Sequence, residues 1–461
     1  MDPSSSYIKK EITNAQDFLI KDQLDHLELQ VMLSSTEADP SPKLKTLLEE
    51  FETLWQLSHQ TSPRSLYGKS RVLDLLAHEQ QSNTLLEKAI QGYVDLLSLG
   101  PSVPAELFKK AGKKCSQLME FRGWTSKAIQ VQKVLAQKFP ETPEFFNKLG
   151  LLYLLSGNEM AAKESFQSSL QRFPANNFAL AHLGLIVTTQ AEKSGVRADL
   201  EEGVRLLQTG LATKEKEVLD GRFFLHLGDG LRRLGKSQEA DLVFQDGAEL
   251  SLYPSFWQRS LYNVEGLTAR PQWTLAETGV EHQLANLVHN WEVIRDEALE
   301  ILRDDTQKGF TSESENLADT GHWSQFELFR QGSKDEGNCL RAPVTCDLVA
   351  KIPEIATNKR GQVKFSLMKG GTHAHAHAGP TNCRLRAHLA LSVLPPKVRA
   401  KTWSGLRVAD KFVTWTEGEM FVFDDSFDHE VWNESEERVV LIVDLWHPGL
   451  TQEQRDTLAP I

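Results

Sequence analysis

Residues 373–389 read HAHAHAGPTNCRLRAHL, and polar and apolar side chains alternate on both sides of a central turn signal. Successive side chains of an extended backbone point to opposite faces, so this spacing predicts that His373, His375 and His377 share one face. Gly379-Pro380 predicts a turn. We therefore expect two half-buried strands of an antiparallel sheet, joined by that turn.

The strand after the turn has one polar and one apolar face. Arg384, Arg386 and His388 share the polar face. The apolar face carries Cys383, Leu385, Ala387, Leu389 and Leu391. Imidazoles bind borderline metals such as Fe(II), and a guanidinium binds a carboxylate through two parallel hydrogen bonds. Together these residue types predict a site for a metal ion and an organic acid.

Length and charge set limits on the whole chain. The chain has 461 residues, which is too long for one ordinary core, so we expect two or three domains. The formal net charge is −12 and no basic stripe is present, which argues against a nucleic-acid partner. No apolar run reaches the roughly 18 residues of a membrane span. We therefore expect no membrane span in this chain. The first residues also lack a signal-peptide pattern.

The four cysteines fall into two groups. Cys115 lies in a helical pattern and Cys383 on an apolar strand face, so both are predicted to be small core residues. Cys339 and Cys346 lie together in a loop that contains glycine and proline. A local disulfide and two free thiols both fit this loop.

A repeat occupies residues 63–265. Gly123 and Ala128 recur 34 residues later as Gly157 and Ala162. A helix–turn–helix period of 34 residues is the tetratricopeptide signature. An irregular helical bundle is the alternative, but several positions keep one register. This segment is therefore predicted to be a tetratricopeptide-like domain that either binds partners on a concave surface or packs as a scaffold.

Two further helical segments flank the repeat. Residues 1–62 are predicted to form an N-terminal helical arm, of which the first forty residues are loosely held. Residues 266–320 are predicted to form a helical bridge with one helix from about Leu275 to Asp304. The bridge ends in a polar linker at residues 311–316.

From residue 321 to residue 461 the chain is predicted to form short strands. Alternating or apolar runs occur at residues 323–329, 362–368, 412–415, 420–423 and 438–446. Many short strands with regular turns favour a jelly roll. The expected fold class is therefore α+β and multidomain, with an α-helical tetratricopeptide-like solenoid followed by a double-stranded β-helix, or jelly roll.

Three residues in this region are arranged as in Fe(II)/2-oxoglutarate oxygenases. His377 precedes the Gly379-Pro380 turn, His429 lies at the end of a later strand, and Arg438 opens the strand after that. In such enzymes two histidines hold the metal and an arginine binds the co-substrate. Non-haem Fe(II) is commonly held by two histidines and a carboxylate. Gly379 stands at the usual carboxylate position, so we expect water there. Asp425 either holds that water or caps the turn from Asp424 to Phe427.

Residues 321–461 closely resemble the catalytic domain of the aspartyl/asparaginyl β-hydroxylase family. The resemblance is carried by Gly321–Phe326, His377–Arg386, Phe423–Phe427, His429–Trp432 and Trp446–Pro448. It extends back through Trp257–Val264 into the repeats. It identifies residues 321–461 as an Fe(II)/2-oxoglutarate oxygenase domain, and the missing carboxylate at Gly379 is a feature of the same family.

The resemblance implies a role for each matching residue. His377 and His429 would hold Fe(II), and Arg438 would pair with the far carboxylate of 2-oxoglutarate. The further co-substrate contacts would be Trp323, Ser366, Arg386, Ala387 and His388. Gln325 and Arg384 would face the substrate. Salt bridging at the surface is the alternative role for Arg384 and Arg386.

The implied reaction is hydroxylation of the β-carbon of Asp or Asn residues in polypeptides. Dioxygen and 2-oxoglutarate would be consumed, and epidermal growth factor-like domains would be the substrate class. The helical repeats would guide the polypeptide or support the fold. The family works in the endoplasmic reticulum lumen, although this chain shows no signal peptide or membrane segment.

Three other functions compete with this interpretation. His373 and His375 depart from the family pattern, and with His377 they could form a cupin-like metal-binding module. Otherwise they would narrow the substrate channel or capture a stray metal. The second alternative is a repeat scaffold whose oxygenase domain is inactive. The third is an oxygenase that acts on a lipid acyl chain.

Overall fold

The computed structural model describes residues 13–34, 39–304, 309–313, 317–393, 404–434 and 436–461. The chain divides into two compact units at the Leu183–Gly184 peptide. Within the described ranges, no helix is long and apolar enough to cross a membrane. The expectations for the first twelve residues and for residues 314–316 of the polar linker lie outside the described residues.

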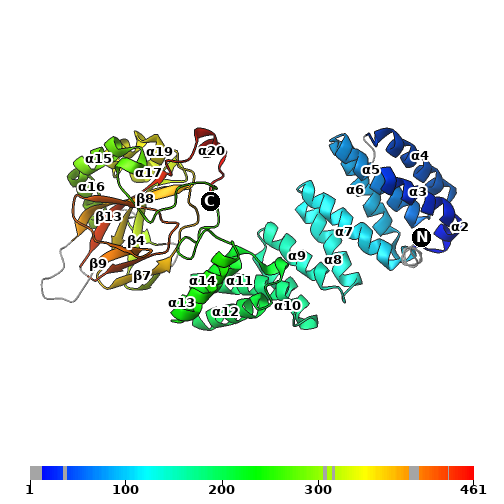
Figure 1. The fold of residues 1–461 in the computed structure, drawn as a ribbon, viewed down its shortest axis with the longest axis horizontal. Helices are drawn as coiled ribbons and strands as arrows, with labels where there is room; N and C mark the ends of the chain where they lie inside the picture. The colour runs from blue at the N-terminus through cyan, green and yellow to red at the C-terminus, as the bar shows by residue number, and fades with distance from the viewer. Residues whose placement is uncertain (1–12, 35–38, 305–308, 314–316, 394–403, 435) are drawn as a thin grey trace. The chain divides into compact units, whose positions relative to one another are not determined.

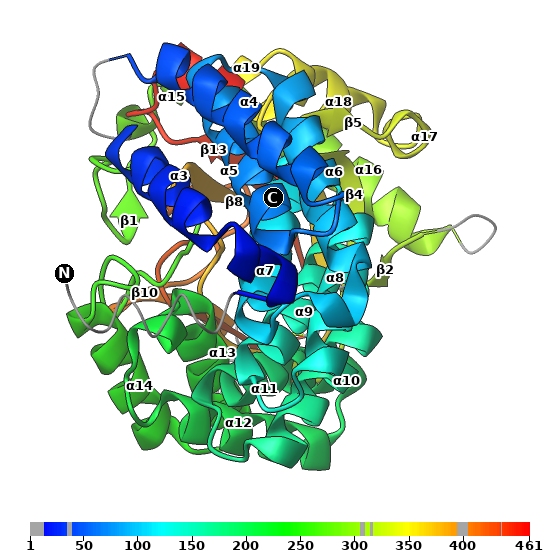
Figure 2. The same ribbon diagram turned by 90° about the vertical axis from the view of Figure 1, so that its right-hand side faces the viewer.

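The N-terminal helices are packed firmly. They are α2 (Ala15–Leu19), α3 (Lys21–Ser34) and α4 (Ser41–Leu57), and they lie beside α5 (Pro63–Glu79) (Figures 1 and 2). The buried Arg64 of α5 pairs with Asp25 and Glu28 of α3, each at 2.7 Å. Leu24, Phe51 and their apolar neighbours are buried in one cluster. The expectation of a loosely held arm is therefore wrong for residues 13–34.

Helical pairs follow one another along the chain, as the 34-residue period predicts. Within the described ranges the pairs are α5 with α6 (Asn83–Ser98), α7 (Ala105–Phe121) with α8 (Thr125–Lys138), α9 (Pro143–Leu155) with α10 (Glu159–Arg172), α11 (Asn177–Ser194) with α12 (Arg197–Leu211), and α13 (Gly221–Arg233) with α14 (Ser237–Glu249). Gly123 and Gly157 take positive φ angles of 71° and 73° at the turns. Gly150 is small because a Cβ there would lie 2.5 Å from the Phe166 ring. The tetratricopeptide-like architecture is confirmed.

The described strands of the second unit form two antiparallel sheets. In the larger sheet the order is β1-β11-β8-β13-β6-β4-β2, with β5 beside β4, and in the smaller it is β10-β9-β12-β7-β3. The large-sheet strands are β1 (Gln272–Trp273), β2 (Thr311–Ser312), β4 (Trp323–Arg330), β5 (Ser333–Lys334), β6 (Gln362–Met368), β8 (Arg384–Val393), β11 (Met420–Phe423) and β13 (Arg438–Trp446). The small-sheet strands are β3 (Ala318–Thr320), β7 (Thr372–His377), β9 (Ser404–Val408), β10 (Lys411–Val413) and β12 (His429–Asn433).

This order confirms the jelly roll. From β6 to β8 and again from β11 to β13, consecutive strands alternate between the two sheets, and β9 with β10 forms a hairpin in the small sheet. A buried cluster fills the space between the sheets; it includes Met368, Ala374, Ala390, Val431 and Ile442. The predicted strand at residues 412–415 is shorter than expected, because β10 ends at Val413.

Helices cover the other face of the large sheet. They are α15 (Glu281–His289), α16 (Trp291–Arg303), α17 (Glu336–Cys339), α18 (Pro343–Ala350) and α19 (Pro353–Ala356), and Figure 1 shows them gathered on one side of the strands. Leu385, Leu389 and Leu391 of β8 are buried in this layer, as their alternation predicts. The single helix predicted from Leu275 to Asp304 is wrong. It is broken at Asn290, whose side chain donates to the Asn286 carbonyl.

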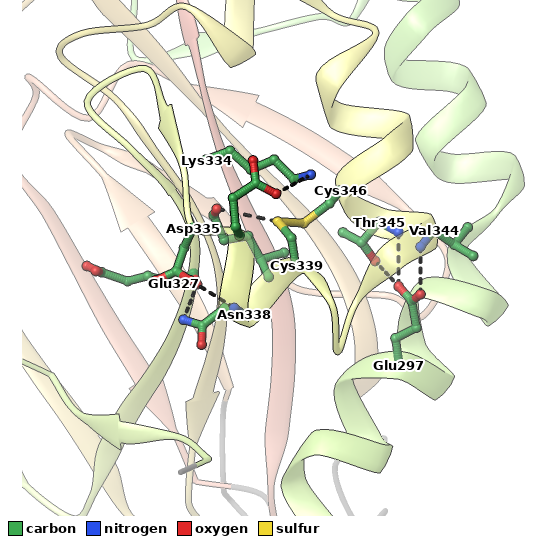
Figure 3. Close-up of a disulfide and its surroundings, with 11 residues drawn as sticks. Glu297, Glu327, Lys334, Asp335, Asn338, Cys339, Val344, Thr345 and Cys346 are labelled. Carbon is green, nitrogen blue, oxygen red and sulfur yellow. Dashed lines mark hydrogen bonds and ion pairs between the residues drawn. A yellow bond between two sulfur atoms is a disulfide. The ribbon is translucent and has the colours of Figure 1, made fainter. Parts of the chain in front are cut away.

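A disulfide joins α17 to α18. Cys339 and Cys346 are bonded, with their Cα atoms 5.7 Å apart (Figure 3). Glu297 of α16 accepts hydrogen bonds from the backbone NH groups of Val344 and Thr345, at 2.7 and 2.9 Å, at the start of α18. A local disulfide and two free thiols both fitted the loop, and the structure shows the disulfide. Cys115 and Cys383 are free and buried, as predicted.

Candidate active site

Two histidines meet where β7 and β12 lie side by side. His377 is paired with His429 across the two strands, and their ring centroids are 4.2 Å apart. Each Nδ1 lies near a backbone carbonyl, 2.6 Å from His375 O and 2.9 Å from Phe427 O. A carbonyl only accepts, so both Nδ1 atoms carry a proton, and Nε2 is the atom of each neutral ring that can bind a metal.

The surroundings of His429 keep its imidazole neutral. His429 is buried, and burial together with the neighbouring His377 lowers its pKa to about 3. A neutral imidazole is the form that binds a metal ion. Backbone hydrogen bonds therefore orient both rings, and burial keeps His429 in the neutral form that can bind a metal.

A bulge in β7 turns His377 inward. Ala374 is paired with Val431, and His377 with His429, so three steps along β7 match two steps along β12. The extra residue reverses the alternation, because side chains one position apart point to opposite faces. His377 therefore lies on the inner side of the sheet together with the buried Ala374.

The other two histidines of β7 lie on the outer side, so the predicted shared face of three histidines is wrong. His373 stacks on Trp432, with ring centroids 5.4 Å apart. Its Nδ1 lies 2.8 Å from Asp319, and its Nε2 lies 2.9 Å from Glu430. Within the described ranges, no three His, Cys, Asp or Glu side chains are gathered to hold a metal. The cupin-like set of His373, His375 and His377 is therefore not formed.

Asp425 fills the space beside Gly379. The Gly379 NH donates to the Asp425 carbonyl at 2.6 Å, and a Cβ at Gly379 would lie 2.6 Å from Asp425 Oδ2. Only glycine leaves room for this carboxylate. The turn itself is capped by Asp424, whose Oδ1 accepts from the NH of Ser426 at 3.0 Å and from its hydroxyl at 2.5 Å. Asp424 is therefore the capping residue, and the Asp425 carboxylate lies beside Gly379.

Arg384 and Arg386 form a buried network with two aspartates. Arg384 Nη2 donates to Asp425 at 2.6 Å, and Arg386 donates to both carboxylate oxygens of Asp444 at 2.7 and 2.9 Å. Burial raises the pKa of Asp425, but the two guanidinium groups outweigh it and hold that pKa well below its usual range. Surface salt bridging is therefore excluded as the role of Arg384, which is 8% exposed.

Arg438 lies in an incomplete binding site. It is 1% exposed, and its Nη2 donates to Ser366 Oγ at 3.3 Å. Its Nε and Nη1 have no hydrogen-bond partner in the described part of the chain. Burial lowers its pKa to about 9, and its guanidinium lies 4.4 Å from the centre of the Trp415 ring. A buried cation with free donors is costly unless an anion binds it.

Trp323, His388 and Arg438 line the same cavity as the histidine pair, and Ser366 lies behind them, fully buried. Ser366 Oγ also accepts from Trp323 Nε1 at 2.9 Å, which leaves the Ser366 proton for a further acceptor. His388 is buried with its Nε2 unpartnered among the described residues, and burial, followed by Arg438, lowers its pKa well below the usual value. The side chain of Ala387 instead belongs to the core under the helices.

Two residues of this site were not predicted from the sequence. Gln362 and Lys364 lie on β6 and line both the inner cavity and a second, outer cavity. Lys364 Nζ donates to Gln325 Oε1 at 2.7 Å, so Gln325, which lines neither cavity, contacts a residue that lines both. The signal was available, because these residues alternate with Ser366 against an apolar face in a strand that was itself predicted.

The outer cavity shares the two histidines with the inner one. His377, His429 and Arg386 line both. The outer cavity adds Arg384 and Arg330. A ligand in either cavity would therefore reach the two histidines.

Fold and site together define a class of jelly-roll proteins in which two facing histidines adjoin a cavity closed by a buried arginine. The particular family follows from sequence comparison. Residues 288–448 match the family model described as aspartyl/asparaginyl beta-hydroxylase. The resemblance predicted for residues 321–461 is confirmed over this segment.

Individual relatives extend the likeness along the chain. The chain is 39% identical over 455 residues to the aspartyl/asparaginyl beta-hydroxylase of Homo sapiens and to that of Mus musculus, with 98% of this chain aligned. It spans 57% and 58% of those two proteins. A shorter match, 35% identical over 144 residues, is to an ornithine lipid ester-linked acyl 2-hydroxylase of Rhizobium tropici, and it covers 31% of this chain and 48% of that protein.

Proposed function

We propose that this chain is an Fe(II)- and 2-oxoglutarate-dependent dioxygenase that hydroxylates the β-carbon of Asp or Asn residues in a polypeptide. The observation that carries the proposal is the buried Arg438, which has two nitrogen atoms without partners among the described residues and lines the same cavity as His377 and His429. The named relatives support the reaction and the substrate class.

The donor set fits ferrous iron. Two Nε2 atoms offer nitrogen ligands, and Asp425, which lines the outer cavity together with both histidines, is the candidate to hold a water on the metal. Iron and 2-oxoglutarate, when bound, supply the oxidising chemistry that inserts one atom of dioxygen into a C–H bond and releases succinate and carbon dioxide. The protein holds and orients these groups.

The inner cavity fits a dicarboxylate. Among the described residues, Arg438 has two NH-bearing nitrogens without partners for the far carboxylate, and its third contacts the buried Ser366 hydroxyl. His388 lines the same cavity, and its Nε2 has no partner in the part of the chain that the structure describes. Each donor satisfied by the ligand removes a buried unpaired group, so binding recovers the cost of burying it.

The outer cavity fits an acidic or amide side chain of a peptide. It presents Lys364, Arg384 and Arg386 beside the metal pair, with Gln362 as a further hydrogen-bonding group. Guanidinium and ammonium groups bind carboxylates and amide oxygens. Epidermal growth factor-like domains remain the proposed substrate class on the basis of the resemblance to that family.

The test is turnover with a panel of peptides. Iron, 2-oxoglutarate and dioxygen are supplied, succinate is measured, and the peptide is checked by mass for one added oxygen atom. Asp and Asn peptides with and without epidermal growth factor-like spacing form the panel, and an acyl lipid is the comparison substrate. We expect oxidation of an Asp or Asn peptide; oxidation of the lipid alone would overturn the peptide assignment.

Two histidine variants separate the competing functions. His429→Ala should abolish turnover and metal binding, whereas His373→Ala, on the outer side of the same sheet, should keep both. A cupin-like module would show the reverse. An inactive scaffold would bind neither iron nor 2-oxoglutarate.

A further inference from the structure

Asp428 is a buried carboxylate immediately before the ligand His429, and three arginines surround it. Arg232 Nη1 donates to it at 2.6 Å, Arg407 Nη2 donates at 2.9 Å, and Arg259 is also bonded to it. Asp428 is 0% exposed. Burial raises its pKa, but the three guanidinium groups outweigh burial and keep the pKa well below its usual range.

These arginines come from different parts of the second unit. Arg232 is in α13, in the last helical pair before the jelly roll, and it also bonds to Asp241 of α14 at 3.2 Å. Arg259 belongs to the segment between α14 and β1, and Arg407 belongs to β9. Asp428 therefore joins a helical repeat, a connecting segment and a strand at one carboxylate.

The connecting segment also holds the backbone on which His429 depends. Asp428 NH donates to the Trp257 carbonyl at 2.6 Å. The adjoining Phe427 carbonyl accepts from His429 Nδ1. The Phe427 carbonyl and the Asp428 NH belong to one planar peptide group. The hydrogen bond from the Asp428 NH to Trp257 therefore also fixes the direction of the Phe427 carbonyl, and this carbonyl orients the His429 ring.

The same segment holds the loop after His377. Tyr262 NH donates to the Pro380 carbonyl at 2.9 Å. Val264 exchanges two hydrogen bonds with the side chain of Asn382, each at 2.9 Å. One segment outside the jelly-roll strands thus reaches the chain beside both metal ligands.

We infer that Asp428 is a positioning residue for the metal site, and that Arg232 and Arg259 act through it to couple the last helical repeat to His429. The inference rests on the proposed function, because it assigns a consequence for metal binding. An aspartate that served folding alone would change thermal stability and leave metal affinity unchanged.

The experiment measures metal binding without turnover. Metal-free full-length protein is titrated with Co(II), a spectroscopic substitute for Fe(II), and the visible absorption gives the dissociation constant well below the unfolding midpoint. Asp428→Asn and Arg232→Gln are compared with wild type, and Arg232→Lys tests rescue by a retained charge. Arg205→Gln is the matched control, since its exposed ion pair with Glu202 lies on α12, away from the site.

We expect Asp428→Asn and Arg232→Gln to weaken Co(II) binding at least tenfold, and Arg232→Lys to recover part of the loss. The control should bind as wild type does. If Asp428→Asn does not fold, Arg232→Gln decides the question, because two arginines still neutralise Asp428. Wild-type affinity in Arg232→Gln would overturn the inference. Failure of the wild-type protein to bind Co(II) would instead overturn the proposed function.

Discussion

At the scale of single residues, the site is built from groups that are costly to bury. Arg438 has two nitrogen atoms without partners, and His388 has one, in the described part of the chain. Such groups lower stability unless a ligand completes their hydrogen bonds. They are therefore better explained by ligand binding than by folding.

Replacing Arg438 with methionine separates these two effects. Arg438→Met should weaken 2-oxoglutarate binding by at least roughly 30-fold, since loss of a buried charged contact costs about 2–5 kcal/mol. Without 2-oxoglutarate it should raise the thermal midpoint, because an unpaired buried cation is removed. Ligand titration and thermal unfolding measure both, and Arg197→Met, at an exposed pair with Glu201, is the control. A variant that binds 2-oxoglutarate normally would contradict the role of Arg438.

Restoring the usual third carboxylate ligand should fail in this site. Gly379→Asp should lose metal affinity, because its Cβ would lie 2.6 Å from Asp425 Oδ2 and two carboxylates would repel each other. Gly379→Ala adds the Cβ without the charge and should cause a smaller loss. Co(II) titration of both variants measures the difference. Tighter binding by Gly379→Asp would show that Asp425 moves aside.

At the scale of secondary-structure elements, alternation predicted most of the strand faces correctly. The strand β8 buries its apolar side under the helices and directs Arg384, Arg386 and His388 toward the site, as expected. The same argument failed in β7, because the bulge places His377 on the inner face of the sheet and His373 stays on the outer face. A bulge depends on pairing with a partner strand, so the periodicity of one strand does not reveal it.

His373 joins three strands on the outer side of the small sheet, and it should make their stability depend on pH. Its hydrogen bond to Glu430, followed by the one to Asp319, raises its pKa above the usual 6.5. The stabilisation is fully present below pH 6.5 and is lost as the pH rises through the raised pKa. His373→Gln should therefore cost most stability at acidic pH and least at alkaline pH.

Urea unfolding of both proteins across that pH range measures the effect. His282→Gln is the control, since that histidine is exposed near the start of α15. A stability difference that does not change with pH would show that His373 acts through stacking on Trp432 alone.

At the scale of the whole molecule, the chain consists of two compact units, and every contact described for the active site lies in residues 184–461. A protein that begins at α11, residues 177–461, should therefore bind Co(II) as the full chain does. Residues 266–461 should bind it much more weakly, because Arg232 and Arg259 are lost and Asp428 keeps only Arg407.

Metal titration of the three purified proteins tests this requirement. Circular dichroism checks that each fragment is folded. Full affinity in residues 266–461 would show that the jelly roll positions His429 without the helical repeat.

The amino-acid sequence alone established the repeat period, the polar and apolar strand faces and the order of His377, His429 and Arg438, because these follow from local periodicity and from residue chemistry. Tertiary structure was needed to show the inward turn of His377, the carboxylate of Asp425 beside Gly379 and the three arginines around Asp428. These features arise from contacts between segments far apart in the chain. The local sequence is compatible with several side-chain positions, and strand register and burial determine which of them is adopted.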